Sequence, residues 1–141
     1  MTGKNLDILR AERATQFIAK IKPEQVADKK ELQKVGEIRQ EIEALPARLR
    51  MNGLLQTLVY LLNKDKKDRI RVGKEIIDHL SGRLGFPLPI TEHGSTAVSI
   101  CSKHLSRATE EASAYVTWLK LMAKAELPKP DKEGTGDVTS K

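Results

Sequence analysis

Residues 46–63, PARLRMNGLLQTLVYLLN, constrain the fold more than any other part of the sequence. From residue 54 to residue 62 the apolar side chains wrap most of a helical circumference. A helix tolerates that pattern only where neighbours cover it from several sides. These side chains are Leu54, Leu55, Leu58, Val59, Leu61 and Leu62. The pattern therefore predicts a buried central helix with the rest of the chain packed around it.

One strip of this helix is polar. Its members recur at four-residue spacing and are expected to lie one above the next. They are Arg48, Asn52, Gln56, Tyr60 and Lys64. Such a strip faces solvent or a ligand, and solvent is the commoner case because any amphipathic helix needs a polar side. Gly53 interrupts the apolar run at a cost of about 1 kcal/mol relative to alanine, which predicts a close helix crossing there.

Two helices are predicted before the central one. Residues 5–21 carry apolar side chains at helical spacing, and Pro23 ends this helix. Asp28 and Glu31 have the spacing of a capping box, which predicts the start of a second helix. We expect Pro46 to end or kink the second helix and to open the central one, because proline fits the first turn of a helix but not its interior.

The remaining chain predicts two or three more helices. A charged turn follows the central helix and leads into an amphipathic helix that reaches Leu84. Residues 85–90, GFPLPI, are not helical, whereas residues 95–106 form a weaker helix and residues 108–127 a strong one that Pro128 ends.

These patterns predict an all-α fold, a compact bundle of five to six helices around the buried central helix. The length of 141 residues fits one domain. We expect a single helical domain over residues 1–127 and a disordered C-terminal tail over residues 128–141, because the tail has no apolar period.

Patterns typical of an active site or a metal site are missing from the sequence. His79, His93 and His104 fall in different predicted elements without metal-ligand spacing, and we interpret them as incidental. Cys101 has the character of a small core residue and has no partner for an internal disulfide. No Gly-rich phosphate loop is present. The sequence therefore predicts no enzyme, no cofactor and no metal, and in the absence of a signal peptide or long apolar run a cytoplasmic protein without membrane contact.

The net charge of +6 is concentrated in one window. Residues 48–74 contain eight basic and two acidic residues, whereas basic and acidic residues balance in the rest of the chain. A localised basic patch of this kind is typical of proteins that bind a phosphate backbone. The alternative is a lysine-rich turn that only solubilises the chain.

Three blocks of sequence together resemble one family, the small helical subunit of the type III-B CRISPR (Cmr) effector complex. The blocks are LRAERATQFIAKI, LPARLRMNGLLQTLVYLLNK and RATEEASAYVTWLKLMAKAEL. The resemblance implies a non-catalytic subunit in antiviral defence that stacks in several copies along the RAMP backbone and lines the groove for CRISPR RNA and target RNA. It also implies association with the large polymerase-like subunit.

The charge map agrees with this role, because guide–target pairing reads the sequence and the protein needs only phosphate contacts. The predicted contacts to nucleic acid are Arg48, Arg50, Lys64, Lys66, Lys67 and Arg69, with Arg10 and Arg13 in addition. The alternative function is a free-standing helical protein–protein adaptor whose basic patch only solvates the chain. A small helical enzyme is a third reading with little to support it.

Overall fold

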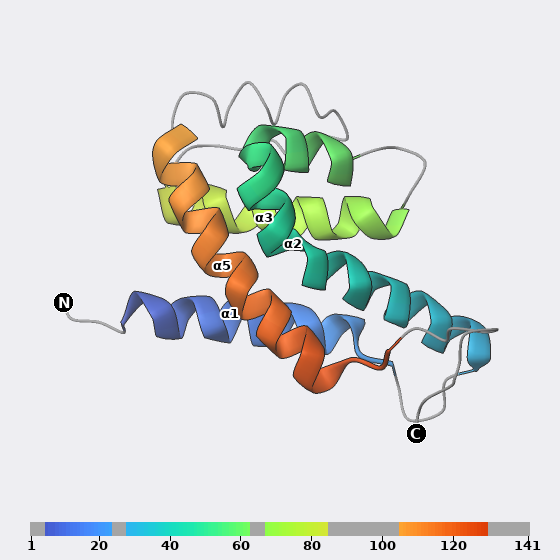
Figure 1. Ribbon diagram of the computed structural model, residues 1–141. Helices are drawn as coiled ribbons and strands as arrows, with labels where there is room; N and C mark the ends of the chain where they lie inside the picture. The colour runs from blue at the N-terminus through green and yellow to red at the C-terminus, as the bar shows by residue number, and fades with distance from the viewer. Residues whose placement is uncertain (1–4, 24–27, 63–66, 85–104, 130–141) are drawn as a thin grey trace.

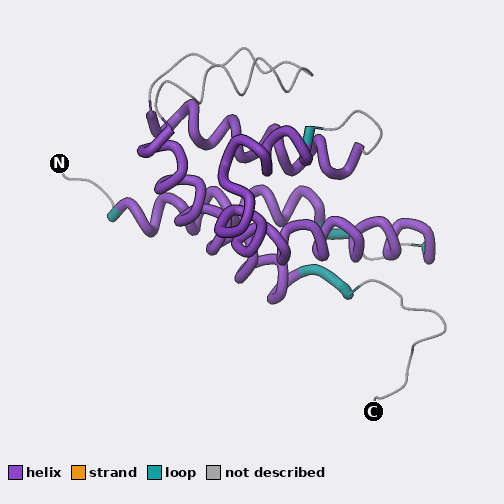
Figure 2. The backbone as a smooth tube through the Cα atoms, turned by 45° about the horizontal axis from the view of Figure 1, so that its top comes forward, coloured by secondary structure: helices purple, strands orange, loops and turns teal. Residues whose placement is uncertain are grey.

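The computed structural model describes residues 5–23, 28–62, 67–84 and 105–129. Within these ranges the chain is all-α, as predicted, and it contains four helices and no strand (Figures 1 and 2). They are α1 (Leu6–Ile21), α2 (Lys29–Leu61), α3 (Lys67–Leu84) and α5 (Leu105–Glu126). The predicted helix over residues 95–106 lies almost entirely outside the described residues, as do the segment 85–90 and residues 130–141 of the predicted tail.

The predicted starts of the first two helices are confirmed by their caps. The Asn5 side chain accepts a hydrogen bond from the backbone N–H of Asp7 at 2.7 Å, and α1 ends two residues before Pro23. The Asp28 side chain accepts from the backbone N–H of Glu31 at 2.8 Å. Each cap satisfies a backbone donor that the first turn of a helix leaves without a partner.

The predicted boundary at Pro46 is wrong, because α2 continues through it. A proline inside a helix costs about 3 kcal/mol, since it removes a hydrogen bond and crowds the preceding turn. Ile42, Leu45 and Leu49 are all buried around this point. Their burial on one stripe of α2 offsets the cost and holds the helix together across the proline.

The break in α2 lies at Gly53 instead. Its backbone has φ 84° and ψ 168°, a conformation that is essentially confined to glycine. The predicted close helix crossing at this residue is also wrong, because an added Cβ would meet no atom within 4 Å. Glycine is therefore required here for its backbone conformation, and the two parts of α2 meet at an angle (Figure 1).

The break changes which side chains meet. In a straight helix Arg48 and Tyr60 would lie about 18 Å apart along the axis. In the folded chain their side chains are hydrogen-bonded at 3.0 Å, because the part of α2 after Gly53 folds back over the part before it. The polar strip predicted to run straight from residue 48 to residue 64 is therefore interrupted at Gly53.

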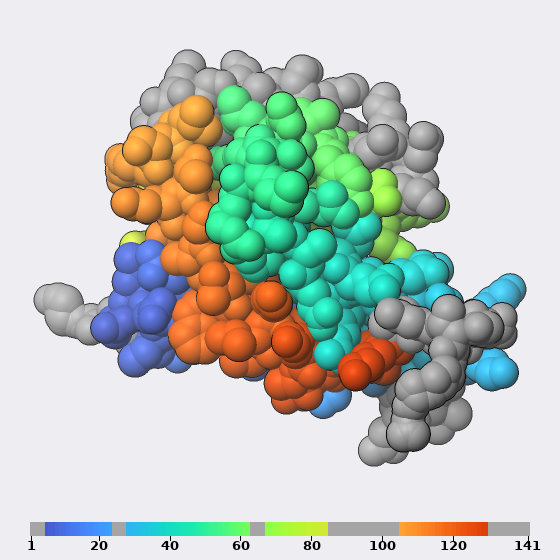
Figure 3. Space-filling view, in the orientation of Figure 1, coloured from blue at the N-terminus to red at the C-terminus, as the bar shows by residue number. Residues whose placement is uncertain are grey.

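All four helices contribute to one hydrophobic core. Of the residues of the segment 46–63 predicted to be buried, Leu54, Leu58, Leu61 and Leu62 are in this core, Leu55 is partly buried against it, and Val59 is 51% exposed. α5 packs against each of the other three helices, most extensively against α2 and α1. Figure 3 shows α5 and α2 lying side by side across one face of the molecule. The last helix is thus as central to the packing as the predicted central helix.

One buried arginine on α2, Arg39, is bonded to the chain that follows α5. Arg39 is only 8% exposed, although its place in the sequence pattern put it on the outer face of its helix. Its side chain donates to the backbone carbonyl of Leu127 at 2.7 Å and to the carboxylate of Glu43 at 2.6 Å. The chain just after α5 is therefore fastened to α2 by a charge-assisted hydrogen bond.

Candidate nucleic-acid interface

Two of the predicted contact residues, Arg48 and Arg69, meet around Tyr60. The two guanidinium carbons lie 4.1 Å and 4.3 Å from the centroid of the tyrosine ring. The Tyr60 hydroxyl donates to the Glu41 carboxylate at 3.0 Å, and Arg69 Nε donates to the same carboxylate at 3.0 Å. We call Glu41, Arg48, Tyr60 and Arg69 the Tyr60 cluster. It joins both parts of α2 to the first turn of α3.

The Tyr60 cluster carries more positive than negative charge. Two guanidinium groups share the single carboxylate of Glu41, and cation–π contacts to the tyrosine ring stabilise both of them. Burial, together with the neighbouring Glu41 carboxylate, raises the pKa of Tyr60, so its hydroxyl stays protonated and keeps donating. Arg48 and Arg69 side chains are 33% and 26% exposed, so both arginines reach solvent from a fixed position.

A surface hollow of about 540 Å³ adjoins the cluster. It is lined by three basic residues, Lys34, Lys67 and Arg69, by three acidic residues, Glu37, Glu41 and Asp68, and by Gln40. Both lysines are exposed, and neither forms an ion pair within the described residues. Lys67 is one of the predicted contacts, whereas Lys34 on α2 was not predicted from the sequence. The structure thus adds one cation to the predicted set.

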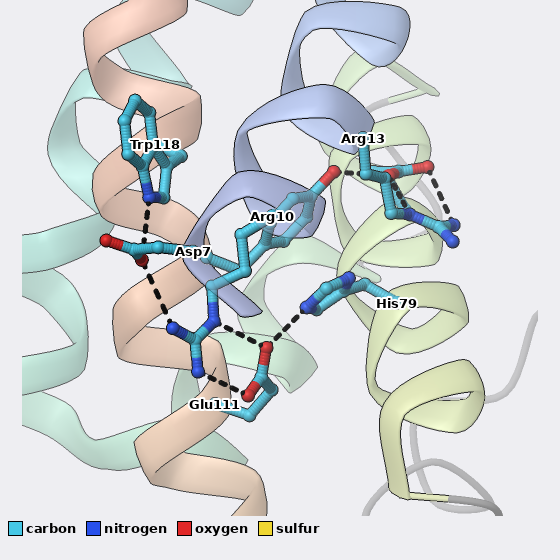
Figure 4. Close-up of polar contacts among 8 residues, drawn as sticks. Asp7, Arg10, Arg13, His79, Glu111 and Trp118 are labelled. Carbon is cyan, nitrogen blue, oxygen red and sulfur yellow. Dashed lines mark hydrogen bonds and ion pairs between the residues drawn. The ribbon is translucent and has the colours of Figure 1, made fainter. Parts of the chain in front are cut away.

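Two more of the predicted arginines, Arg10 and Arg13, bind carboxylates on other helices, with side chains that are 16% and 37% exposed. Arg10 binds Glu111 through two hydrogen bonds, Nε to Oε2 at 2.9 Å and Nη2 to Oε1 at 2.8 Å (Figure 4). Its third bond is to Asp7 at 3.2 Å, and Asp7 also accepts from the Trp118 indole at 3.1 Å. Arg10 therefore joins α1 to α5 as a bidentate ion pair, the strongest geometry that an arginine and a carboxylate form.

Arg13 joins the same layer of polar contacts between helices, with its side chain partly exposed. Its Nε donates to Glu75 at 2.7 Å, and the Tyr115 hydroxyl donates to the same carboxylate oxygen at 2.6 Å. The Tyr115 ring stacks on His79 with centroids 3.9 Å apart. Burial, followed by the adjacent Glu75 carboxylate, raises the pKa of Tyr115 well above its ordinary value. Tyr115 is therefore a permanent donor that links α5 to α3.

His79 completes the layer, although its place in the sequence indicated no role. The residue is 3% exposed, and its Nε2 lies 2.7 Å from Glu111 Oε2. Burial lowers the pKa of His79, so at neutral pH the ring is uncharged and its Nε2–H donates to the carboxylate. Burial alone would raise the pKa of Glu111, but hydrogen bonds from Arg10 and His79 outweigh it and lower that pKa.

These shifts predict a loss of stability in mild acid. A histidine whose pKa is lowered by folding binds its proton more weakly in the folded state than in the unfolded state. Its contribution to stability is therefore complete above the unfolded value of about 6.5 and is lost as the pH falls through the window below it. We expect the free energy of unfolding to fall between pH 7 and pH 5 with a slope of up to about 1.4 kcal/mol per pH unit for this one proton.

Urea unfolding of wild type and a His79→Gln variant at several pH values measures this effect. The glutamine keeps an N–H donor for Glu111 but does not titrate. We expect a flatter profile for the variant above pH 5, where carboxylates with ordinary or lowered pKa values stay ionised. Parallel profiles for the two proteins would show that His79 does not titrate in this window.

The structure therefore divides the predicted contacts into three groups. Arg48 and Arg69 meet at the Tyr60 cluster, and Lys67 lines the adjoining hollow. Arg50 is exposed on α2 and forms no ion pair within the described residues. Arg10 and Arg13 bind carboxylates in the layer between α1, α3 and α5. Lys64 and Lys66 are outside the described residues.

Three long-range partners in this region were missed by the analysis of the sequence. Glu41, Glu75 and Glu111 lie 28, 62 and 101 residues from Arg69, Arg13 and Arg10. Helical periodicity reports only on neighbours three or four residues apart. No signal in a single sequence indicates which acidic residue on another helix a given arginine meets.

Neither a metal site nor a membrane span is found in the described part of the chain. No three His, Cys, Asp or Glu residues among 5–23, 28–62, 67–84 and 105–129 are placed to hold a metal ion. None of the four helices combines the length and apolar character needed to cross a bilayer.

Comparison with known proteins identifies the family. The family model of a CRISPR-associated protein (Cas_Cmr5) matches residues 8–126, which is most of the chain. No curated protein matches the chain. The match extends from the first helix to the end of the last one, and all four described helices lie wholly or almost wholly within it. The chain belongs to the Cas_Cmr5 family, the small, non-catalytic helical subunit of the type III-B Cmr complex.

Proposed function

We propose that this subunit helps to hold guide and target RNA in the Cmr effector through the cations on and around the Tyr60 cluster. The observation that carries the proposal is the exposure of Arg50 and Lys67 without ion pairs inside the described residues. The arginines of the cluster, Arg48 and Arg69, are partly exposed as well. Lys64 and Lys66 belong to the proposed surface through their place in the chain between Tyr60 and Lys67.

Charge and geometry together support binding to phosphate groups. A guanidinium group has five N–H donors, and Arg69 uses only its Nε for Glu41. Its remaining donors are available for phosphate oxygens. Two guanidinium groups already lie over the Tyr60 ring, so the ring is not expected to stack on a base. The proposed binding therefore depends on phosphate contacts. Contacts of this kind are independent of sequence, which suits an effector in which guide–target pairing reads the sequence.

Arg10 and Arg13 do not take part in the proposed surface. Both guanidinium groups bind carboxylates in the layer between α1, α3 and α5. Withdrawing Arg10 from Glu111 would leave a largely buried charge without its main partner, which costs several kcal/mol, whereas the partly exposed Arg13 would lose less. We therefore assign these two arginines to the stability of the fold.

The partners follow from membership of the family. We propose that several copies stack along the RAMP backbone, beside the large polymerase-like subunit, in a cytoplasmic complex with CRISPR RNA.

RNA binding at two salt concentrations tests the proposal. We expect an unstructured RNA to bind the full-length chain much more weakly at ~200 mM than at ~50 mM salt, because each neutralised phosphate adds about 0.7 to the salt slope. A variant with Arg50→Ala and Lys67→Ala should bind more weakly at ~50 mM salt, with a slope about 1.4 lower. Electrophoretic mobility shifts measure both quantities.

A matched variant controls for net charge. Lys30→Ala with Lys124→Ala removes the same charge from two other exposed positions. We expect this control to bind RNA nearly as wild type does. Equal losses in the two variants would mean that only net charge matters, which would contradict a localised surface. Association with a protein that is insensitive to salt, with no RNA binding at either salt, would favour the adaptor alternative.

A further inference from the structure

A second hollow lies at the opposite end of α3 from Lys67. It has a volume of about 370 Å³ and is lined by Leu6, Arg10, Arg83, Leu84, Arg107, Glu110, Glu111 and Ala114. The start of α1, the end of α3 and the start of α5 surround it, and these helix ends gather on the left of Figure 1. Three helices therefore contribute side chains to one concave site.

Two arginines on the rim of this hollow have guanidinium groups that are free to bind a ligand. Arg83 and Arg107 are exposed, and neither forms an ion pair or a hydrogen bond with its side chain in the described part of the chain. They come from different helices, so their convergence is a product of the fold. Two guanidinium groups at one hollow favour an anion with several oxygens, such as a phosphate, because each can donate two parallel hydrogen bonds.

The wall behind these arginines is fixed and nearly neutral. Arg10 and Glu111 lie there as a bidentate ion pair, and His79 holds the second oxygen of the carboxylate (Figure 4). Glu110 is the other acidic residue of the lining, and its side chain is exposed. The site therefore has two free positive charges against one free negative charge.

The rest of the lining is apolar. Leu6, Leu84 and Ala114 are all partly buried and together form an apolar part of the lining, here called the floor, whose side chains offer no hydrogen bonds. A floor of this kind suits a flat ring, and the volume is at the lower end of the range for small-molecule sites. A ligand with a ring at one end and a phosphate at the other matches the apolar residues and the two free arginines of the hollow.

We propose that this hollow binds a nucleoside phosphate unit, with its phosphate on Arg83 and Arg107 and its base against the floor. The unit is either a free nucleotide or one residue of a strand. The proposal is independent of the RNA surface at the Tyr60 cluster. Sixteen residues of α3 separate Lys67 from Arg83, a distance of about 24 Å along the helix.

Calorimetric titration of the full-length chain with adenosine 5′-monophosphate, adenosine and a short oligoadenylate tests the proposal. We expect the nucleotide to bind at least about tenfold more tightly than the nucleoside, and an Arg83→Gln, Arg107→Gln variant to lose about tenfold in affinity. Both arginines are exposed, so the variant should keep the circular dichroism spectrum and melting temperature of wild type. Binding of the oligoadenylate alone, with the same loss in the variant, would identify a strand as the source.

Two further variants make the test specific. Glu110→Gln removes the free carboxylate from the rim, so we expect it to bind the nucleotide about two- to threefold more tightly. Arg50→Ala with Lys67→Ala should leave nucleotide binding unchanged, which separates this site from the proposed RNA surface. The proposal is overturned if the nucleoside binds as well as the nucleotide. It is equally overturned if neither phosphate-bearing probe loses affinity in the double arginine variant, or if Glu110→Gln weakens binding.

Discussion

A Glu111→Ala substitution is expected to lower the free energy of unfolding by about 3–5 kcal/mol. Glu111 is 8% exposed and accepts hydrogen bonds from Arg10 on α1 and His79 on α3. Removing the carboxylate leaves the Arg10 guanidinium, 16% exposed, with only Asp7 as a partner and leaves His79 without its acceptor. The loss is a large fraction of the 5–15 kcal/mol that holds a domain of this size together.

Denaturation by urea, followed by circular dichroism, measures this effect against a neighbour. Glu110→Ala removes the same group from the next position, where the side chain is exposed, and is expected to change stability by no more than about 0.5 kcal/mol. An equally small change for both variants would mean that the ion pair between α1 and α5 contributes little. The layer between α1, α3 and α5 would then be held by its apolar contacts and by the other polar pairs, such as Arg13 and Tyr115 with Glu75.

A Gly53→Ala substitution is expected to destabilise the chain by about 1–3 kcal/mol, although an added methyl group has free space. No atom lies within 4 Å of the position of the new Cβ, so the cost comes entirely from the backbone. With φ 84° and ψ 168°, the residue occupies a region that a side chain makes strained. A relaxed alanine would straighten α2 and separate Arg48 from Tyr60.

Gly82→Ala is the matched control, because it also has free space at the Cβ position but lies inside α3 with an ordinary helical backbone. Alanine is the better helix former there, so this variant should gain about 0.5–1 kcal/mol. The two substitutions are therefore expected to have opposite signs in thermal or chemical unfolding. Stabilisation by both would show that α2 is straight at residue 53.

These two predictions concern the parts of the structure that set the functional surfaces. The break at Gly53 brings the Tyr60 cluster together, and the cluster presents the arginines of the proposed RNA surface. The layer around Glu111 forms the wall of the hollow between Arg83 and Arg107. Loss of RNA binding in Gly53→Ala and loss of nucleotide binding in Glu111→Ala would therefore be indirect effects.

Local features were predicted well from the sequence. The all-α class, the start of the first helix near residue 5, the cap at Asp28 and the end of the last helix before Pro128 depend on neighbours within one turn. Most of the predicted core residues are buried, because an apolar stripe must be covered by something whatever its partner is. The basic window was likewise visible, since charge is a property of composition.

Two errors in the prediction have one cause. Pro46 has a strong local signal for a boundary and Gly53 a weaker one, yet the helix continues through the first and breaks at the second. A proline inside a helix costs about 3 kcal/mol. The free energy gained by burying Ile42, Leu45 and Leu49 exceeds this cost. Tertiary packing therefore decided where α2 turns.

The sequence by itself determined the helices, their caps, the apolar stripes and the location of excess positive charge along the chain. Only the tertiary structure decided which cations are free. Arg10 and Arg13 find carboxylates on distant helices, whereas Arg50, Arg83 and Arg107 find none among the described residues. The physical reason is the separation along the sequence over which each kind of contact acts. Helix formation depends on contacts three or four residues apart, but the pairing of charges depends on how whole helices pack, which no local pattern records.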